Sequence, residues 1–199
     1  HRIAEAVGCS VLKVKAPRHR VHHRLSVHED ETDELLDLER LVDQAAVSVR
    51  LPILRQSDLW ARAATELSEH CDLSAMTIQK ALESREREQS TGLAEGVALT
   101  GLSIPGLEAP LVGIFSTERR IPWAGPTRID IDVLVIILAS PAHRQAHLWL
   151  LEGFATMKLR GSLLGGLRAA RSHPQITEAV MRSAAKVDLP VRWSRLNPR

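Results

Sequence analysis

IDIDVLVIIL, residues 129–138, is the stretch that decides the fold of this chain. Its second half, from Val133 to Leu138, is apolar without interruption. A strand with one face in water alternates apolar and polar residues, whereas a strand that is covered on both faces is apolar throughout. The stretch therefore predicts a central β-strand with a layer of helices on each side.

Strand and helix patterns alternate on both sides of this stretch. Residues 46–53 and 110–116 have strand patterns, and residues 92–99 predict a tight turn followed by a short strand. Helix starts are predicted at Ser57, Ser74, Ser140-Pro141 and His173-Pro174. The class is therefore α/β, and we predict a mixed β-sheet with helices on both faces over about residues 36–187. The predicted core includes Leu67, Val97, Val112, Ile114, Val133, Val135, Ile137, Leu151 and Ile176.

The composition argues against several classes of function. Of the 199 residues, 44% are hydrophobic, which is enough for a core. Two Phe, four Trp and no Tyr are few for a surface that stacks bases, and a net charge of +2 gives no electrostatic funnel, so we expect no nucleic-acid partner. Cys9 and Cys71 fit no metal-ligand spacing and no disulfide framework, which favours a cytoplasmic setting. We expect neither a metal nor a cofactor, and no apolar run approaches the roughly 20 residues that span a bilayer.

Residues 16–35 have the composition of a linker. Their histidines are His19, His22, His23 and His28, followed by a block of acidic residues. The histidine spacing fits no compact set of zinc ligands, and the acidic block keeps the segment in water, so a solvated linker is favoured over a metal site. We predict that it joins residues 1–15 to the domain of residues 36–187, which residues 188–199 follow as a tail.

REREQSTGLAEGVALTGLSIPG, residues 85–106, has the form of an approach to an active site. Charged residues lead into Ser-Thr-Gly, and a short apolar run then ends at Thr100 and Gly101. No histidine, cysteine or carboxylate stands in the sequence where this run ends. The stretch raises the question of whether the site works or has lost its reactive group.

Five motifs, in this order along the chain, resemble the type-2 EIIA domain of the sugar phosphotransferase system, the fructose/mannitol and nitrogen-regulatory kind. They are Leu82 with Arg85-Glu86; Ser90-Thr91-Gly92 followed by Gly96-Val97-Ala98-Leu99; Ile129 to Pro141; His147-Leu148 with Leu150-Leu151; and Leu167 with Ala169-Ala170 and Ser172. The resemblance covers about residues 36–187 and implies the mixed sheet of that family.

The resemblance also implies a mechanism. In the family, a histidine directly after G-[IV]-A-[IL]-P takes a phosphoryl group from the histidine of a small carrier protein and passes it to a cysteine on a sugar-transporting partner. A second histidine, on a helix, hydrogen-bonds the phosphate. Matching this chain to the motif puts Thr100 at the proline and Gly101 at the acceptor histidine. His147 takes the helper position, and Arg85 takes that of an arginine near the phosphate.

The match to the family motif predicts where the four residues of the site lie relative to one another. Thr100 and Gly101 are expected at the end of a strand, in a shallow depression, with His147 and Arg85 within a side-chain length. Glycine has no nucleophile, and a phosphothreonine ester is too stable to pass its group onward by the same route. For Arg85 the alternative is a surface arginine paired with Glu86 or Glu88.

Thr91 and Gly92 are expected to serve the turn that precedes the site. The threonine would tie backbone groups together, and the glycine would allow a positive φ. Neither residue is expected to take part in chemistry.

Residues 1–15 resemble the last helix and strand of a universal stress protein domain. In known architectures, such a domain followed by an EIIA domain sits on the cytoplasmic tail of a membrane transporter. The resemblance therefore implies a soluble tail of a transporter of amino acids or ions, with the rest of that transporter as its partner. The chain begins at His1 without an initiator Met, so we expect a piece of a longer protein. Val11, Leu12 and Val14 are expected to be buried, by docking or by self-association.

Three functions follow as hypotheses. The first is a regulatory or interaction module that keeps the EIIA fold without phosphotransfer, because Gly101 cannot accept the group. The second is an active phosphotransferase that uses His147. The third is a sensor of a small anion bound where Gly101 leaves room, with Arg85 to attract it.

Overall fold

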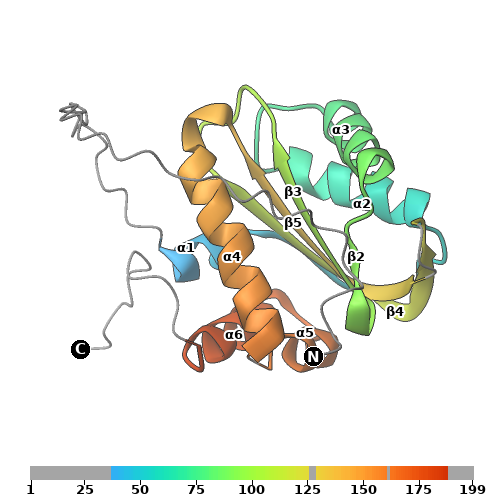
Figure 1. The fold of residues 1–199 in the computed structure, drawn as a ribbon, viewed down its shortest axis with the longest axis vertical. Coiled ribbons are helices and arrows are strands. Elements are labelled where there is room, and N and C mark those ends of the chain that lie inside the picture. The colour runs from blue at the N-terminus through green and yellow to red at the C-terminus, as the bar shows by residue number, and fades with distance from the viewer. Residues whose placement is uncertain (1–36, 126–128, 161, 188–199) are drawn as a thin grey trace, which may run out of the picture. The chain divides into compact units, whose positions relative to one another are not determined.

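The computed structural model describes residues 37–125, 129–160 and 162–187 (Figure 1). The segments predicted as the end of a stress-protein domain, as the linker and as the C-terminal tail lie outside these residues. The described part of the chain forms one five-stranded sheet, in the order β1-β4-β5-β3-β2, with helices against it.

The elements follow one another as an α/β chain. The strands are β1 (Ala46–Leu51), β2 (Gly92–Leu93), β3 (Val97–Ser103), β4 (Leu111–Trp123) and β5 (Ile129–Ala139). The helices are α1 (Leu38–Asp43), α2 (Gln56–Ser68), α3 (Ala75–Glu88), α4 (Arg144–Arg160), α5 (Leu163–Ala169) and α6 (His173–Ala184). Two 3-10 turns, η1 (Ala94–Gly96) and η2 (Pro141–His143), precede β3 and α4.

The sheet is mixed, as predicted. Strand β1 runs parallel to β4, and β3 runs parallel to β5, while β4 and β5 are antiparallel neighbours and β2 is antiparallel to β3. Strand β5 is thereby paired on both edges, which leaves no free backbone groups along its paired length. The central position predicted for residues 129–138 is confirmed.

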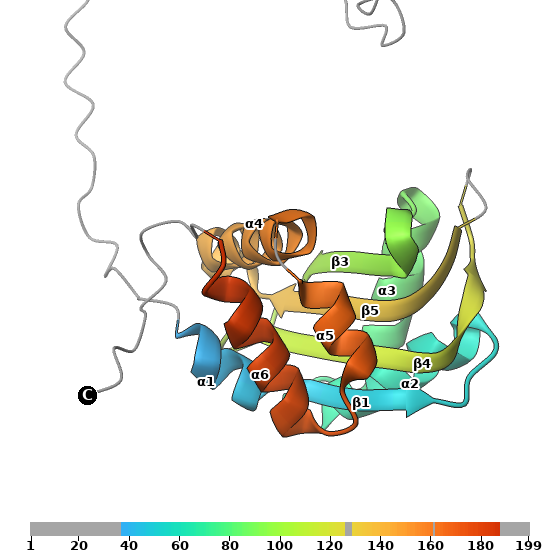
Figure 2. The same cartoon turned by 90° about the horizontal axis from the view of Figure 1, so that it is seen from below.

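The unbroken apolar run of β5 supplies both faces of the sheet. Val133, Val135 and Ile137 belong to the core that α1, α4, α5 and α6 share. Leu134, Ile136 and Leu138 belong to the core of α2 and α3. Figure 2 shows the sheet between these two layers. In a strand that is buried on both faces, each side chain contacts apolar groups and a polar side chain would lose its hydration. This explains why residues 133–138 are all apolar.

The predicted core is confirmed with one exception. Leu67, Val97, Val112, Ile114, Val133, Val135, Ile137 and Ile176 are buried, whereas Leu151 is half-buried at the edge of its cluster. Strand β4 is also longer than predicted, because it continues past an irregularity after Ser116 to Trp123.

The predicted helix starts differ in how they are capped. Ser74 caps α3 as predicted, because its hydroxyl accepts a hydrogen bond from Thr77 N at 3.2 Å. Helix α2, in contrast, begins at Gln56 after the N-cap residue Arg55, so Ser57 lies inside the first turn and its prediction as the cap is wrong.

Candidate functional site

Thr100 and Gly101 lie inside β3 and not at its end, which corrects the prediction. Strand β3 pairs with β5 without interruption from Val97, opposite Val133, to Ser103, opposite Ala139. Successive side chains of a strand point to opposite faces. Thr100 therefore faces the α2–α3 layer, and the open side of Gly101 faces α4.

Helix α4 fills the space over Gly101. A Cβ on Gly101 would lie 2.6 Å from His147 Nε2 and 2.8 Å from Leu151 Cδ1, closer than real Cβ contacts. Gly101 and His147 are thus brought together on one face of the sheet. A side chain at position 101 would have to displace the ends of His147 and Leu151, which in this conformation occupy the space that the hypothesis of an anion sensor assigns to a ligand.

His147 is held as a neutral base. Its Nε2 is buried and has no hydrogen-bond partner among the described residues. Burial lowers the pKa of His147 below its ordinary value of 6.5, because the charged form loses hydration. The Nε2 atom can take part in a hydrogen bond or a proton transfer with an outside group only after it moves away from β3.

A chain of hydroxyl and carboxyl groups occupies the other face of β3. Thr100 Oγ1 donates to Thr91 Oγ1 at 2.8 Å, and Thr91 Oγ1 donates to Glu86 Oε2. Both carboxyl oxygens of Glu86 also accept from Thr91 N at 3.1 Å. All three residues are buried, Thr100 completely. The hydroxyl of Thr100 is therefore not available to a phosphoryl donor in this conformation.

Glu86 is a residue that the sequence interpretation missed. The alternative interpretation of Arg85 made Glu86 or Glu88 its partner on the surface, but Glu86 faces inward and bonds the end of α3 to Thr91. The hydroxyl of Thr91 bonds a carboxyl and a hydroxyl group, whereas the prediction made it bond backbone groups of the turn. The only sign of this contact in the sequence is the spacing of five residues between Glu86 and Thr91. That spacing does not reveal that the glutamate is buried.

The role predicted for Gly92 is wrong. Positive φ in this turn occurs at Glu95 (71°) and Gly96 (85°), and Gly92 is not among the described residues with positive φ. Gly92 is instead required by a close approach, because a Cβ there would lie 2.7 Å from Trp123 Cδ1.

Arg85 lies on α3, on the face of the sheet opposite to His147. Its Nη1 donates to the carbonyl oxygen of Gln89 at 3.1 Å, which ties down the last turn of the helix. The structure thus places His147 next to Gly101, as predicted. The helix that carries Arg85 covers the opposite face of the sheet, so the prediction that Arg85 lies beside them is wrong.

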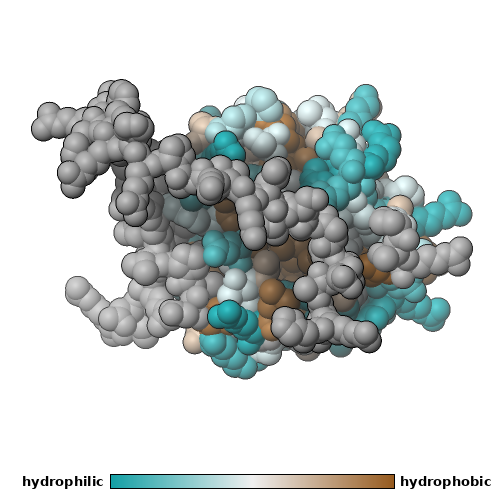
Figure 3. Space-filling model, in the orientation of Figure 1, coloured by the Kyte–Doolittle hydropathy of each residue, from teal (hydrophilic) through white to brown (hydrophobic). Residues whose placement is uncertain are grey.

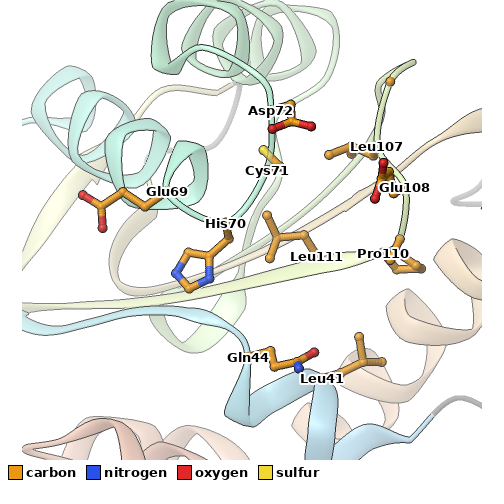
Figure 4. Close-up of a pocket in the computed structure, with 12 residues that line it drawn as sticks. Leu41, Gln44, Glu69, His70, Cys71, Asp72, Leu107, Glu108, Pro110 and Leu111 are labelled. Atoms are coloured by element: carbon orange, nitrogen blue, oxygen red, sulfur yellow. The ribbon is translucent and has the colours of Figure 1, made fainter.

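A cavity of about 620 Å³ lies elsewhere, at the start of β4. Figure 4 shows its walls, which come from the end of α1, the loop after α2 and the segment before β4. Glu69, His70, Cys71, Asp72 and Glu108 line it. Within the described ranges, no three or more His, Cys, Asp or Glu side chains are placed to hold a metal ion. The cavity contains none of the predicted site residues.

Two further properties bear on the surroundings of the site. No helix in the described part of the chain is long and apolar enough to cross a membrane.

Helix α4 exposes Leu148 and Leu159, with 48% and 74% of their surfaces accessible. The space-filling view from the side of α4 shows hydrophobic surface between hydrophilic groups (Figure 3).

Comparisons with known proteins identify the fold. No protein-family profile matches the sequence. A nitrogen regulatory protein of Pseudomonas aeruginosa is 27% identical over 110 residues, which are 55% of this chain and 71% of that protein. The crystal structure of nitrogen regulatory protein IIA-Ntr from Neisseria meningitidis superposes with a TM-score of 0.63 at 20% identity, over 74% of this chain and 97% of that one.

A second solved structure includes a partner protein. It is the complex of mannitol enzyme IIA with phosphorylated enzyme IIB from Escherichia coli, which matches with a TM-score of 0.55 at 13% identity, over 68% of this chain and 94% of that one. The described part of this chain thus has the fold of phosphotransferase-system IIA proteins.

Proposed function

We propose that residues 36–187 are a regulatory, protein-binding module with the fold of a IIA protein that accepts no phosphoryl group. The observation that carries the proposal is the contact of Gly101 with His147. The family resemblance matches Gly101 to the acceptor histidine, and in this chain the position has no side chain and is covered by the ends of His147 and Leu151. A site that is filled by its own helper residue is suited to binding a partner rather than to transferring a group.

The two neighbouring side chains that carry a nucleophilic group are poorly placed to replace the acceptor. Thr100 is fully buried and its hydroxyl is engaged by Thr91. His147 Nε2 is buried against β3. Phosphoryl transfer between proteins needs an exposed nucleophile in line with the donor. These features support the regulatory proposal over the hypothesis of a transferase that uses His147.

The proposed partner is the rest of a membrane transporter of amino acids or ions, at the cytoplasmic face of the membrane. The support is the resemblance of residues 1–15 to the end of a stress-protein domain, together with the IIA fold of the part that follows. The coding sequence upstream of His1 tests this part of the proposal. A series of transmembrane segments there would support it, and a reading frame that lacks them would contradict it.

The phosphotransfer part is tested by incubating the 199-residue chain with the general phosphocarrier proteins and phosphoenolpyruvate. The nitrogen regulatory protein of Pseudomonas aeruginosa, in a parallel reaction, serves as the reference for carrier activity. We expect the mass of this chain to remain unchanged. An acid-labile phosphate that disappears in His147→Ala would contradict the proposal and establish His147 as an acceptor.

A further inference from the structure

Helix α4 has apolar residues on its outer face as well as on the face that covers the sheet. Leu150, Phe154 and Met157 are buried towards the sheet. Leu148 lies two residues before Leu150, a little more than half a turn of helix, and so it points away from the sheet, with 48% of its surface exposed. The outer face of a surface helix is normally polar, so apolar residues there indicate a contact surface.

Two neighbouring rows of side chains make up this outer face. Arg144, Leu148 and Glu152 are spaced by four residues and form the first row, and all three are exposed. Leu151 and Ala155 belong to the next row and are half-buried. Rows with this spacing are the ridges that pack into the grooves of a neighbouring helix. Leu148, Leu151 and Ala155 give the two rows an apolar centre.

The first row has charges of opposite sign at its two ends. Arg144 lies about one turn before Leu148, and Glu152 lies about one turn after it. Neither charge forms an ion pair with another of the described residues. The two charged side chains are therefore free to pair with groups outside this chain.

This order of charges makes the row complementary to an antiparallel copy of itself. A two-fold axis at Leu148 places Arg144 beside the partner's Glu152, and it places Glu152 beside the partner's Arg144. A parallel copy would instead bring like charges together at both ends. Exposed ion pairs add little free energy, so here they determine the orientation, while burial of Leu148 drives the association.

We propose that the outer face of α4 is the contact surface for a second copy of this chain. The two α4 helices pack antiparallel about a two-fold axis, with Leu148 against the partner's Leu148 and an ion pair on each side. Because no phosphoryl transfer is involved, this dimer does not depend on the function proposed above. It also uses a surface different from residues 1–15, through which self-association was predicted from the sequence.

Sedimentation equilibrium of the 199-residue chain over a range of concentrations tests the proposal. A contact that is built on one helix from each copy is small, so we expect a reversible dimer and not a permanent one. The expected dissociation constant is about 100 μM or tighter. A chain that is still monomeric at about 500 μM overturns the proposal.

Four variants locate the contact. Leu148→Glu places two carboxylates at the axis and should raise the dissociation constant at least about tenfold. Arg144→Glu and Glu152→Arg each replace two attractions with two repulsions, and each should weaken the dimer. The two charge reversals combined in one chain restore opposite signs, and the dissociation constant should return to within about threefold of the original value.

The matched control is Met76→Glu, which changes an exposed apolar residue on α3, over the opposite face of the sheet. It should dimerise like the original chain, and circular dichroism checks that each variant is folded. A dimer that Leu148→Glu leaves unchanged has its contact on another surface, and this outcome overturns the proposal. A double variant that dimerises no better than the two single charge reversals overturns the antiparallel arrangement.

Discussion

His147 Nε2 lies 2.6 Å from the point that a Cβ on Gly101 would occupy. The imidazole on α4 therefore packs directly on the backbone of β3, with Leu151 beside it. This contact links a helix to the sheet at the position where the family resemblance expects the reactive group.

Gly101→Ala is expected to lower the free energy of unfolding by about 1–3 kcal/mol, because the new methyl group displaces His147 and Leu151. In a His147→Ala background the loss should be smaller, since one of the two displaced groups is gone. Urea denaturation of the four proteins of this double-mutant cycle measures the difference. Gly165→Ala is the control, because a Cβ there meets nothing within 4 Å, and it should be neutral or stabilising. Equal losses in both backgrounds would show that His147 is not the obstacle.

Stability should depend on pH through His147. Burial lowers the pKa of this histidine in the folded state, so the unfolded chain takes up the proton first as the pH falls. The stability associated with the neutral imidazole is therefore complete above pH 6.5 and is lost as the pH falls from there towards the folded-state pKa. Urea denaturation at pH 8, 6.5 and 5 should show a smaller acid loss for His147→Gln than for the original chain. Parallel losses in the two proteins would assign the effect to other titratable groups.

The hydroxyl of Thr91 should matter more than that of Thr100. Thr91→Val removes one bond to Glu86 and one from Thr100, and it leaves buried polar groups short of partners, so a loss of about 2–3 kcal/mol is expected. Thr100→Val removes a single bond and keeps the volume of a fully buried side chain, with an expected loss of about 1 kcal/mol or less. Chemical denaturation measures both values. The reverse order would mean that the network does not run from Thr100 through Thr91 to Glu86.

Glu95→Asn is expected to stabilise the turn before β3. Glu95 has φ 71° and ψ 9°, a left-handed conformation that asparagine adopts more readily than glutamate. The variant loses the ion pair with Lys158 Nζ at 3.3 Å, in which Glu95 is 64% and Lys158 12% exposed, so this loss offsets part of the conformational gain. A net gain of about 0.5 kcal/mol should raise the thermal midpoint. Glu95→Ala, which loses the pair without the conformational gain, should not raise it.

The sheet could be predicted from the sequence because its signals are local. The apolar run from Val133 to Leu138 requires cover on both faces wherever the neighbouring elements lie, and the structure has that cover. The cap at Ser74 is likewise determined within three residues of chain. Patterns of this kind depend on the period of a strand or on the first turn of a helix, and both are visible in the sequence.

The site could be predicted only in part, because its contacts join distant segments. The order of motifs indicated Gly101 and His147, and the structure brings them together across 46 residues of chain. Three features depend on packing between distant segments, which a local sequence pattern does not show. They are the burial of Thr100, the burial of Glu86 and the contact of Gly92 with Trp123. The orientation of Arg85 similarly depends on which face of the sheet α3 covers.

The packing of His147 on Gly101 also limits how this protein can evolve. A larger residue at position 101 meets the imidazole first, so it is accommodated only if the side chains of His147 and Leu151 move, if position 147 changes, or if α4 shifts. A histidine introduced alone at position 101 would be selected against for its effect on folding before any benefit in chemistry could appear. The effect of a substitution at position 101 therefore depends on the residue at position 147. The order of substitutions at these two positions, and not only their number, then determines whether a lineage can place a reactive group at position 101.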